Sequence, residues 1–385
     1  MTNEMSTPSK KQATPMEKRE GPLQAVLSFI GADNLSLILA LFILVLLVTV
    51  VSGWLGFTGG EKFFSWQNLM NSLAQAIVIV GLLSVGETVV IIAGALDISV
   101  GSIASVGSVV AASALVGTGV VGSLHIFPTG SVFWAILAGI LGGMACGAIN
   151  GVVVTALRVN PTIATLGTLA AFAGFAFLLA PEGKPIGVVT QPNFTWLASG
   201  RFLTDLPLPK LGGAAWTGIP VLTVILVAVA LLVHVIMSYT TFGRAIYATG
   251  GNATAARLAG INLSRVRVMM YMISGGIAGL AGVLLTARTT SGNPINGSGI
   301  ELQAITAVYL GGAATSGGKG TVMGTFLAVI LVGVLNNGMN LLGFNTFTQK
   351  VALGLLLIAA VAISQYRQAR AERARTSLAA EPAAK

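Results

Sequence analysis

Charged side chains are scarce in this chain. Asp, Glu, Lys and Arg together account for 9% of its 385 residues, whereas an ordinary soluble protein carries about 25%. Because a fold in water needs a polar exterior, so few charges exclude the two or three soluble domains that this length would otherwise suggest. The mean hydropathy of +0.87 indicates the same.

Cysteine and histidine are nearly absent. Cys146 is the single cysteine, so an intrachain disulfide and a thiolate metal site are both excluded. The two histidines, His125 and His234, have no partner at a spacing typical of metal ligands. No serine-hydrolase, zinc or dinucleotide-binding pattern occurs either. We therefore predict a protein that is not an enzyme and uses no metal or cofactor.

Aromatic residues amount to only 7% and do not alternate with basic ones, as they do on surfaces that bind nucleic-acid strands. The net charge of +9 therefore does not indicate nucleic-acid binding. In a membrane protein, Lys and Arg gather in cytoplasmic loops and tails. We expect the excess positive charge to lie there.

Long apolar runs are what the chain has in abundance, and many can cross about 30 Å of hydrocarbon. They predict an all-α polytopic membrane protein with about ten transmembrane helices. The eighth run is short, and we expect it to be broken or re-entrant. The 49 glycines fit a bundle of closely packed helices. The ten runs are 36–53, 73–94, 99–117, 132–157, 162–180, 218–239, 267–287, 301–313, 321–342 and 347–365.

Ten crossings would place both ends of the chain on one side of the membrane. If that side is the cytoplasm, most of the 21 Lys and Arg residues lie inside, as the positive-inside rule requires. Only six would lie outside: Lys62, Lys184, Arg201, Lys210, Arg288 and Lys350. We expect a multi-pass membrane protein with a cytoplasmic tail (1–34), a transmembrane domain (35–366) and a basic cytoplasmic tail (367–385).

Two loops and a faint repeat organise the predicted domain. The longest external loop covers 181–217 and the longest internal loop covers 240–266, where soluble partners can dock. Asn150-Gly151 precedes Gly167 at the spacing at which Asn337-Gly338 precedes Gly354. The two helix pairs would run in opposite directions, which predicts inverted-repeat halves with a transport path between them.

Acidic residues in apolar surroundings need a reason, because an ionised group in lipid is costly. Asp97 lies between two apolar runs, beside Ser99 and Ser102. It can line a conduit at a broken helix, or it can cap the next helix at an ordinary turn. Glu87 lies in a run without a second acid close in sequence, so a hydrogen-bonded helix contact is favoured over a proton relay. Glu301 is expected at the membrane interface.

Neutral amides and hydroxyls on several predicted helices suit a path for an uncharged, hydroxylated solute. They suit hydrogen bonds between helices equally well. The candidate path residues are Asp97, Ser99, Ser102, Asn150, Thr165, Asn336, Asn337 and Asn340.

The glycine-rich stretch 311–320 does not satisfy the phosphate-loop pattern. Ala313 stands where that pattern has its first glycine, and Gly320 stands where it has Ser or Thr. We predict a tight cytoplasmic turn.

Four motifs in order resemble the permease subunits of ribose/xylose/galactose-type ABC sugar importers. They are GALDISVGS (94–102), PTIATLGT (161–168), TFGRAIYATGGN with AARLAGI (241–252 and 255–261), and LGG with GGKG (310–312 and 317–320). The resemblance covers about 35–365. It implies a permease of the bacterial inner membrane that translocates a monosaccharide or a similar small polyol by alternating access. Its implied partners are a separate ABC ATPase, a periplasmic sugar-binding protein and a second permease copy, as a homodimer or a pair with a similar permease.

The resemblance also identifies about 243–261 as the segment that couples to the ATPase. The residues agree with a short helix there, since Ala253–Leu258 favours helix, Asn252 can cap its start and Gly260 can end it. A connector held at lipid headgroups by Arg257 and Arg265 is the alternative. The candidate coupling residues are Arg244, Asn252, Ala255, Ala256, Arg257 and Gly260.

Two other transport functions compete with this one. An ion-coupled secondary transporter would need paired buried acids or histidines. The sequence offers few such residues, namely Glu87 and Asp97. An ABC permease for branched-chain amino acids would have to accommodate a zwitterion, and the sugar-type motifs argue against it.

Overall fold

The computed structural model describes residues 32–54, 63–188 and 191–380. The predicted N-terminal tail falls mostly outside the described residues. Almost all regular structure is helical, and the strands are two-residue pairs. The chain is therefore an all-α polytopic protein, as its hydropathy predicted.

Seven helical stretches of the described chain are long and apolar enough to cross a membrane. They are η1 with α3 (Gln67–Leu73, Ala74–Ile92), α4 with α5 (Val100–Val116, Gly119–Ser123), α6 (Val132–Ala156), α7 (Pro161–Leu179), α9 (Val221–Tyr239), α12 (Leu263–Thr289) and α14 (Val322–Leu341).

Three further apolar helices match the remaining predicted runs. Shorter apolar windows lie in α2 (Ala32–Trp54) and α15 (Thr346–Ala380). The helix α13 (Glu301–Leu310) has ten residues, about 15 Å at the α-helical rise, which is half of the apolar layer. The eighth run is therefore short, as expected, and ten complete crossings stay a prediction.

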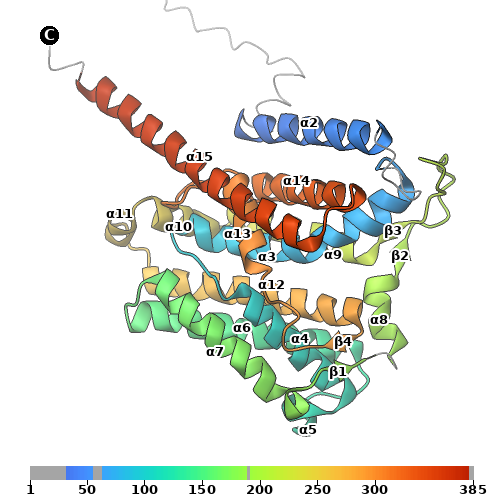
Figure 1. The fold of residues 1–385 in the computed structure, drawn as a ribbon. Helices are drawn as coiled ribbons and strands as arrows, with labels where there is room; N and C mark the ends of the chain where they lie inside the picture. The colour runs from blue at the N-terminus through green and yellow to red at the C-terminus, as the bar shows by residue number, and fades with distance from the viewer. Residues whose placement is uncertain (1–31, 55–62, 189–190, 381–385) are drawn as a thin grey trace, which may run out of the picture.

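The helices form two groups (Figure 1). In one group α12 packs on α6 and α4, and α4 packs on α6 and α7. In the other α3 packs on α14 and α13, and α13 packs on α14 and α15. The helix α3 also packs on α12, which joins the two groups. The helix α2 also packs on α14, so each group contains helices from both halves of the sequence.

Glycine makes the contact between α6 and α12 possible. Gly139, Gly143, Gly147 and Gly151 recur every fourth residue along one face of α6. A β-carbon on Gly143 would overlap the carbonyl oxygen of Gly275 in α12, and the same holds for Gly147 and Tyr271. Small residues at this spacing let two helix backbones approach each other closely.

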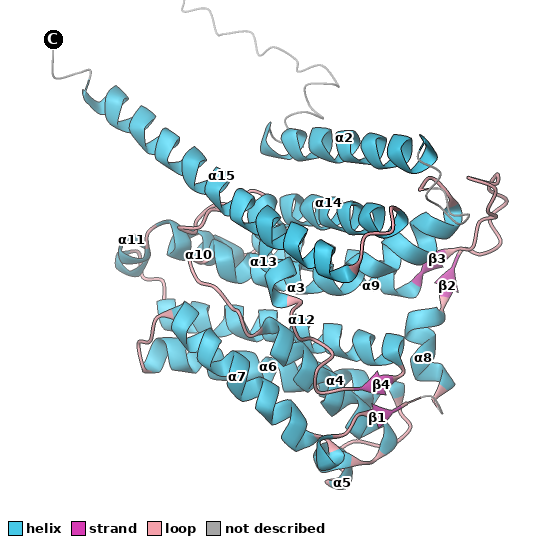
Figure 2. Ribbon diagram, viewed as in Figure 1, coloured by secondary structure: helices cyan, strands magenta, loops and turns pink. Residues whose placement is uncertain are grey.

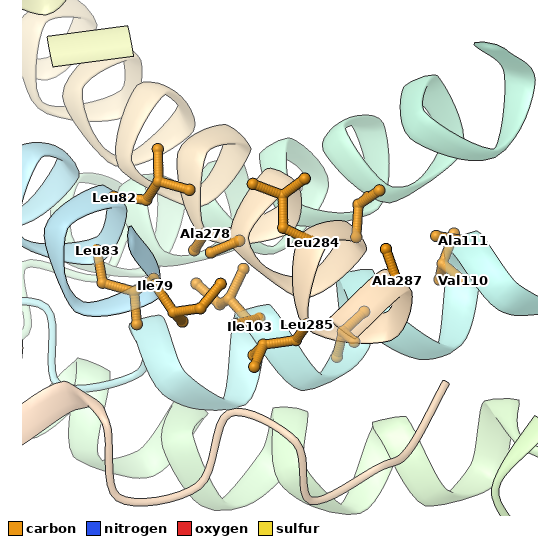
Figure 3. Packing of buried hydrophobic residues seen from close by; sticks show 14 of the residues in the cluster. Ile79, Leu82, Leu83, Ile103, Val110, Ala111, Ala278, Leu284, Leu285 and Ala287 are labelled. Carbon is orange, nitrogen blue, oxygen red and sulfur yellow. The ribbon is translucent and has the colours of Figure 1, made fainter. Parts of the chain in front are cut away.

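Apolar side chains fill the space between α3, α4 and α12 (Figure 3). Leu82, Ile103 and Leu284 meet there, and each is at most 1% exposed. Large apolar side chains also cover the outside, such as Phe42 of α2 and Leu178 of α7, which are 65% and 76% exposed. An exterior this apolar suits lipid.

The two ends of the bundle differ (Figure 2). At one end lie the short helices α10 (Thr241–Gly251) and α11 (Ala253–Leu258). At the other lie α8 (Pro192–Ser199) and two strand pairs. One pair joins β1 (Ile186–Gly187) antiparallel to β4 (Ser291–Gly292), and the second joins β2 (Arg201–Phe202) to β3 (Ile219–Pro220). The single turn η2 (Pro181–Gly183) precedes β1.

Candidate functional site

The linker between α3 and α4 (93–99) is non-helical and enters the protein interior. Asp97 is fully buried, and its N–H donates to Glu87 Oε1 at 2.9 Å. Asp97 Oδ1 accepts from the N–H and the hydroxyl of Ser99, at 2.9 and 2.6 Å. The chain is not helical here, which both interpretations of Asp97 allow, and the lining of a conduit by Asp97 stays a prediction. The carboxylate of Asp97 is hydrogen-bonded by protein groups, and it does not cap α4, where Ser99 is the N-cap residue.

Side chains from α6 and α7 hold this linker in place. Asn150 Nδ2 donates to Ser99 Oγ at 2.8 Å and lies 3.3 Å from Asp97 Oδ1. Thr165 donates to the carbonyl of Leu96 at 3.2 Å. Ser102 donates to the carbonyl of Ser99 at 2.8 Å. Five of the eight candidate path residues therefore form one buried cluster, which we call the linker cluster: Asp97, Ser99, Ser102, Asn150 and Thr165.

Glu87 joins the linker cluster through the backbone of Asp97, so the favoured hydrogen-bonded contact is present, to the linker rather than to another helix. The second buried acid that the sequence did not place near Glu87 is Asp97, which the fold brings to it. Glu87 Oε2, Asn150 Oδ1, Tyr271 Oη and Ser274 Oγ are buried and have no hydrogen-bond partner among the described residues. No feature of the sequence predicted that Tyr271 and Ser274 of α12 are buried polar residues of this kind.

The remaining three path candidates lie on α14, away from the linker cluster. Asn337 exchanges two amide hydrogen bonds of 2.9 Å with Asn68 of η1, and both side chains are buried. Asn340 accepts from Gln349 at 2.6 Å. Asn336 Oδ1 is buried without a partner in the described part of the chain. Asn68 was not among the predicted path residues, because the predicted run begins five residues later. An amide at the edge of an apolar run could have indicated it.

Three of the sequence motifs meet at a glycine-lined contact, which we call the glycine junction. The N–H of Gly318 donates to the carbonyl of Ile92, at the end of α3, at 2.8 Å. A β-carbon on Gly250 of α10 would overlap that same carbonyl oxygen. A β-carbon on Gly317 would lie 2.6 Å from the α-carbon of Gly94. Gly94 and Gly317 also have φ of +80° and +82°, a region that favours glycine.

Tyr247 of α10 adds a side-chain bond to the glycine junction. Its hydroxyl donates to the carbonyl of Gly320 at 2.9 Å. Burial raises the pKa of Tyr247, so the hydroxyl keeps its proton for this bond. The stretch 311–320 is a tight turn between α13 and α14, where Gly317 donates to Ala314 and Ala314 donates to Lys319. The predicted turn is confirmed.

The segment 243–261 contains the short helix that its sequence predicted. Asn252 caps α11 by accepting the N–H of Ala255 at 3.0 Å, and Gly260 follows the helix with φ of +86°. Ala256 is 4% exposed and faces its own chain. Arg244, Ala255 and Arg257 are exposed, and so is Leu258 at 85%. The helix therefore presents one face outward at this end of the bundle.

Comparison with known proteins identifies the family. Residues 68–361 match the family described as the branched-chain amino acid transport system / permease component. This chain belongs to that permease family.

Curated relatives match this permease over more than three quarters of its length. It is 37% identical to the ribose import permease protein RbsC of Bacillus subtilis, over 86% of this chain and 92% of the relative. It is 35% identical to the L-arabinose transport system permease protein AraH of Escherichia coli, over 78% and 83%, and 33% identical to the D-allose transport system permease protein AlsC of that species, over 84% and 90%. No solved structure matches the chain.

The permease is thus an integral, multi-pass transport component of the inner membrane, and its relatives are transport subunits rather than enzymes. The linker cluster and the glycine junction both lie within the matched range.

Proposed function

We propose that this permease is the membrane subunit of an ATP-binding-cassette importer that translocates a monosaccharide or a similar small polyol. The single observation that carries the proposal is its similarity along nearly the whole chain to relatives named for ribose, arabinose and allose transport. The family description names branched-chain amino acids, but the named relatives transport sugars.

Energy would enter through a separate ATPase that docks on α10 and α11. The outward face of α11, with Ala255 and Leu258, suits a groove on such a partner. The glycine junction joins α10 to the end of α3 and to the turn before α14. The helix α10 itself packs on α3 of one group and on α12 of the other, so a shift of α10 would reach both helix groups, as alternating access requires. A periplasmic sugar-binding protein would dock at the opposite end, and a second permease copy would complete the path.

The two helix groups support inverted halves. The contacts of α12 with α4 and α6 have counterparts in the contacts of α3 with α13 and α14. The contact of α4 with α7 has its counterpart in that of α13 with α15. We propose that 74–179 and 263–362 are repeats of opposite orientation, with ten membrane segments and both termini in the cytoplasm.

We further propose that the candidate path residues shape the solute path indirectly, by holding backbone segments in position. Asp97, Ser99, Asn150 and Thr165 are fully buried, which suits residues that fix the course of the α3–α4 linker. The amide pair of Asn68 and Asn337 would similarly hold η1 against α14.

Reconstitution tests the proposal. The permease, its ATPase and its binding protein are placed in proteoliposomes, and uptake of radiolabelled ribose, arabinose, allose and leucine is measured with and without ATP. We expect ATP-dependent uptake of one of the sugars only when all three proteins are present, and no uptake of leucine. Concentrative uptake by the permease alone, driven by an ion gradient, would refute the ABC assignment.

Reporter fusions test the orientation. Fusions to the two termini, and to the segment after Leu258, are expected to report the cytoplasm. A fusion between β2 and β3 is expected to report the periplasm. A periplasmic signal at α11 would exclude that helix as an ATPase contact.

A further inference from the structure

The linker between β4 and α13 (293–300) is the second non-helical stretch inside the bundle, and it is open on one side. Ser298 and Gly299 are exposed. Ile295 and Leu302 flank them and are 57% and 54% exposed. Glu301 is partly exposed, and its Oε2 accepts the N–H of Gly299 at 3.0 Å.

This linker lies near the middle of the apolar layer. The N–H of Gly297 donates to Ser105 Oγ of α4 at 2.9 Å. Ser105 is about 17 Å, at the helical rise, from the end of α4 beside α5. Glu301 is about 14 Å from the opposite end of the bundle, where α13 ends beside α10. Each length is about half of the roughly 30 Å of the hydrocarbon core. They would therefore place the linker near mid-depth, and Glu301 deeper than the interface that the sequence predicts for it.

Exposed polar side chains at this depth cannot face lipid. The N–H groups of residues 293–300 are bonded within the protein, but Ser298 is exposed and Glu301 is partly exposed. In lipid, the hydroxyl and the carboxylate would lose their hydrogen bonds to water, which costs several kcal/mol. Such groups are stable only where protein covers them or water reaches them. The exposed helix faces elsewhere, such as Leu231 at the middle of α9, do not have this constraint because their side chains are apolar.

We propose that residues 295–302 form part of the wall of the water-filled solute path, and that the carboxylate of Glu301 accepts hydrogen bonds from hydroxyl groups of the passing solute. This inference rests on the proposed transport function. A carboxylate offers about four lone-pair directions, and Gly299 takes one of them. The linker cluster, by contrast, is buried and cannot touch a solute in this conformation.

Cysteine labelling tests whether water reaches the linker. In a Cys146→Ala background, Ser298→Cys and Leu302→Cys are compared with Leu231→Cys, which replaces a residue 56% exposed, close to the 54% of Leu302. The permease–ATPase complex in lipid nanodiscs is treated with a methanethiosulfonate that carries a quaternary ammonium, without nucleotide and after vanadate trapping.

We expect rapid modification at positions 298 and 302 in at least one of the two states, and at least tenfold slower modification at position 231. Unreactive cysteines at 298 and 302 in both states would overturn the proposal. Equal reactivity at 231 would also overturn it, because exposure without water contact would then explain the labelling.

The role of Glu301 is tested by uptake in the reconstituted system. Glu301→Gln keeps an oxygen for the N–H of Gly299 but loses the charge, so we expect about tenfold less solute moved per ATP hydrolysed, with an unchanged melting temperature. Glu182→Gln, at an exposed carboxylate outside the bundle, is the control and should transport normally. Normal uptake by Glu301→Gln would show that transport does not need hydrogen bonds from the solute to the Glu301 carboxylate. If the cysteines at 298 and 302 are modified but the wild-type complex takes up no sugar, the water-filled path would stand and the proposed substrate would be refuted.

Discussion

Several buried polar side chains of this permease hold particular backbone segments in position, and Asp97 is one of them. Asp97 accepts three donors from Ser99 and Asn150, and its own N–H is paired with Glu87. In an interior where water is absent, each of these donors would otherwise be unsatisfied. Asp97 therefore fixes the α3–α4 linker in one conformation.

Replacing Asp97 tests this role. Asp97→Ala leaves the donors of Ser99 and Asn150 without an acceptor, so we expect a loss of about 3 kcal/mol in stability. A melting curve of the purified permease in detergent measures the loss. Asp97→Asn, which retains one oxygen, should lose less. Asp205→Ala, at an exposed loop position, should melt as the wild type does. An unchanged melting temperature for Asp97→Ala would show that the network does not hold the linker.

Two neighbouring alanines of α11 separate folding from partner binding. Ala256 is buried against its own chain, whereas Ala255 is exposed. Ala256→Asp should lower the folded yield, because a carboxylate would be buried without a partner. Ala255→Asp should fold normally and should lower the amount of ATPase that co-purifies at least tenfold. Normal co-purification with Ala255→Asp would argue against α11 as the docking site.

At the scale of helices, the glycines of α6 and those of α7 have different surroundings. Those on the face toward α12 leave room for backbone contact, while the glycines of α7 at 167 and 174 have open space around them. Composition alone shows that glycine is abundant, and the spacing of four in α6 marks the contact face. Which helix that face meets is visible only in the fold.

Alanine at Gly143 and at Gly174 should therefore have opposite effects. Gly143→Ala forces α6 and α12 apart and should destabilise the permease by about 1–3 kcal/mol. Gly174→Ala meets nothing and should be neutral or stabilising by about 0.5–1 kcal/mol, because alanine favours helix. Thermal unfolding of both variants measures the difference. Equal melting temperatures would contradict the close contact.

Helix boundaries followed hydropathy closely. The run predicted at 132–157 is α6 at Val132–Ala156, and the run at 321–342 is α14 at Val322–Leu341. The beginning of the second run was missed, because η1 contains Gln67, Asn68 and Asn71, which lower its hydropathy. The burial of Asn68 against Asn337 compensates for these amides, and that partner is 269 residues away.

At the scale of the whole molecule, the glycine junction connects the end with α10 and α11 to both helix groups. Gly250 approaches the last turn of α3, and Gly317 approaches Gly94 at the start of the α3–α4 linker. A rigid contact of this kind can transmit a displacement, because backbones in contact leave no flexible side chain to absorb it.

A substitution in the junction tests the transmission. Gly250→Ala would displace the carbonyl of Ile92, so we expect ATP hydrolysis by the assembled complex to continue while uptake falls at least fivefold. The ratio of solute moved to ATP hydrolysed in proteoliposomes measures this. Gly167→Ala, in open space on α7, should keep the wild-type ratio. A wild-type ratio in Gly250→Ala would show that coupling does not pass through this contact.

The sequence by itself determined that the chain is helical and lies in a membrane, and it located nearly every helix. It also placed the cap of α11 and the turn at 311–320. These properties depend on the transfer free energy of each residue and on bonds between near neighbours, both of which are local. Only the tertiary structure decided that Asp97 meets Glu87 and Asn150, that Asn337 meets Asn68, and that the linker before α13 is open on one side. Such contacts join segments far apart in the chain, and their geometry depends on how the helices pack.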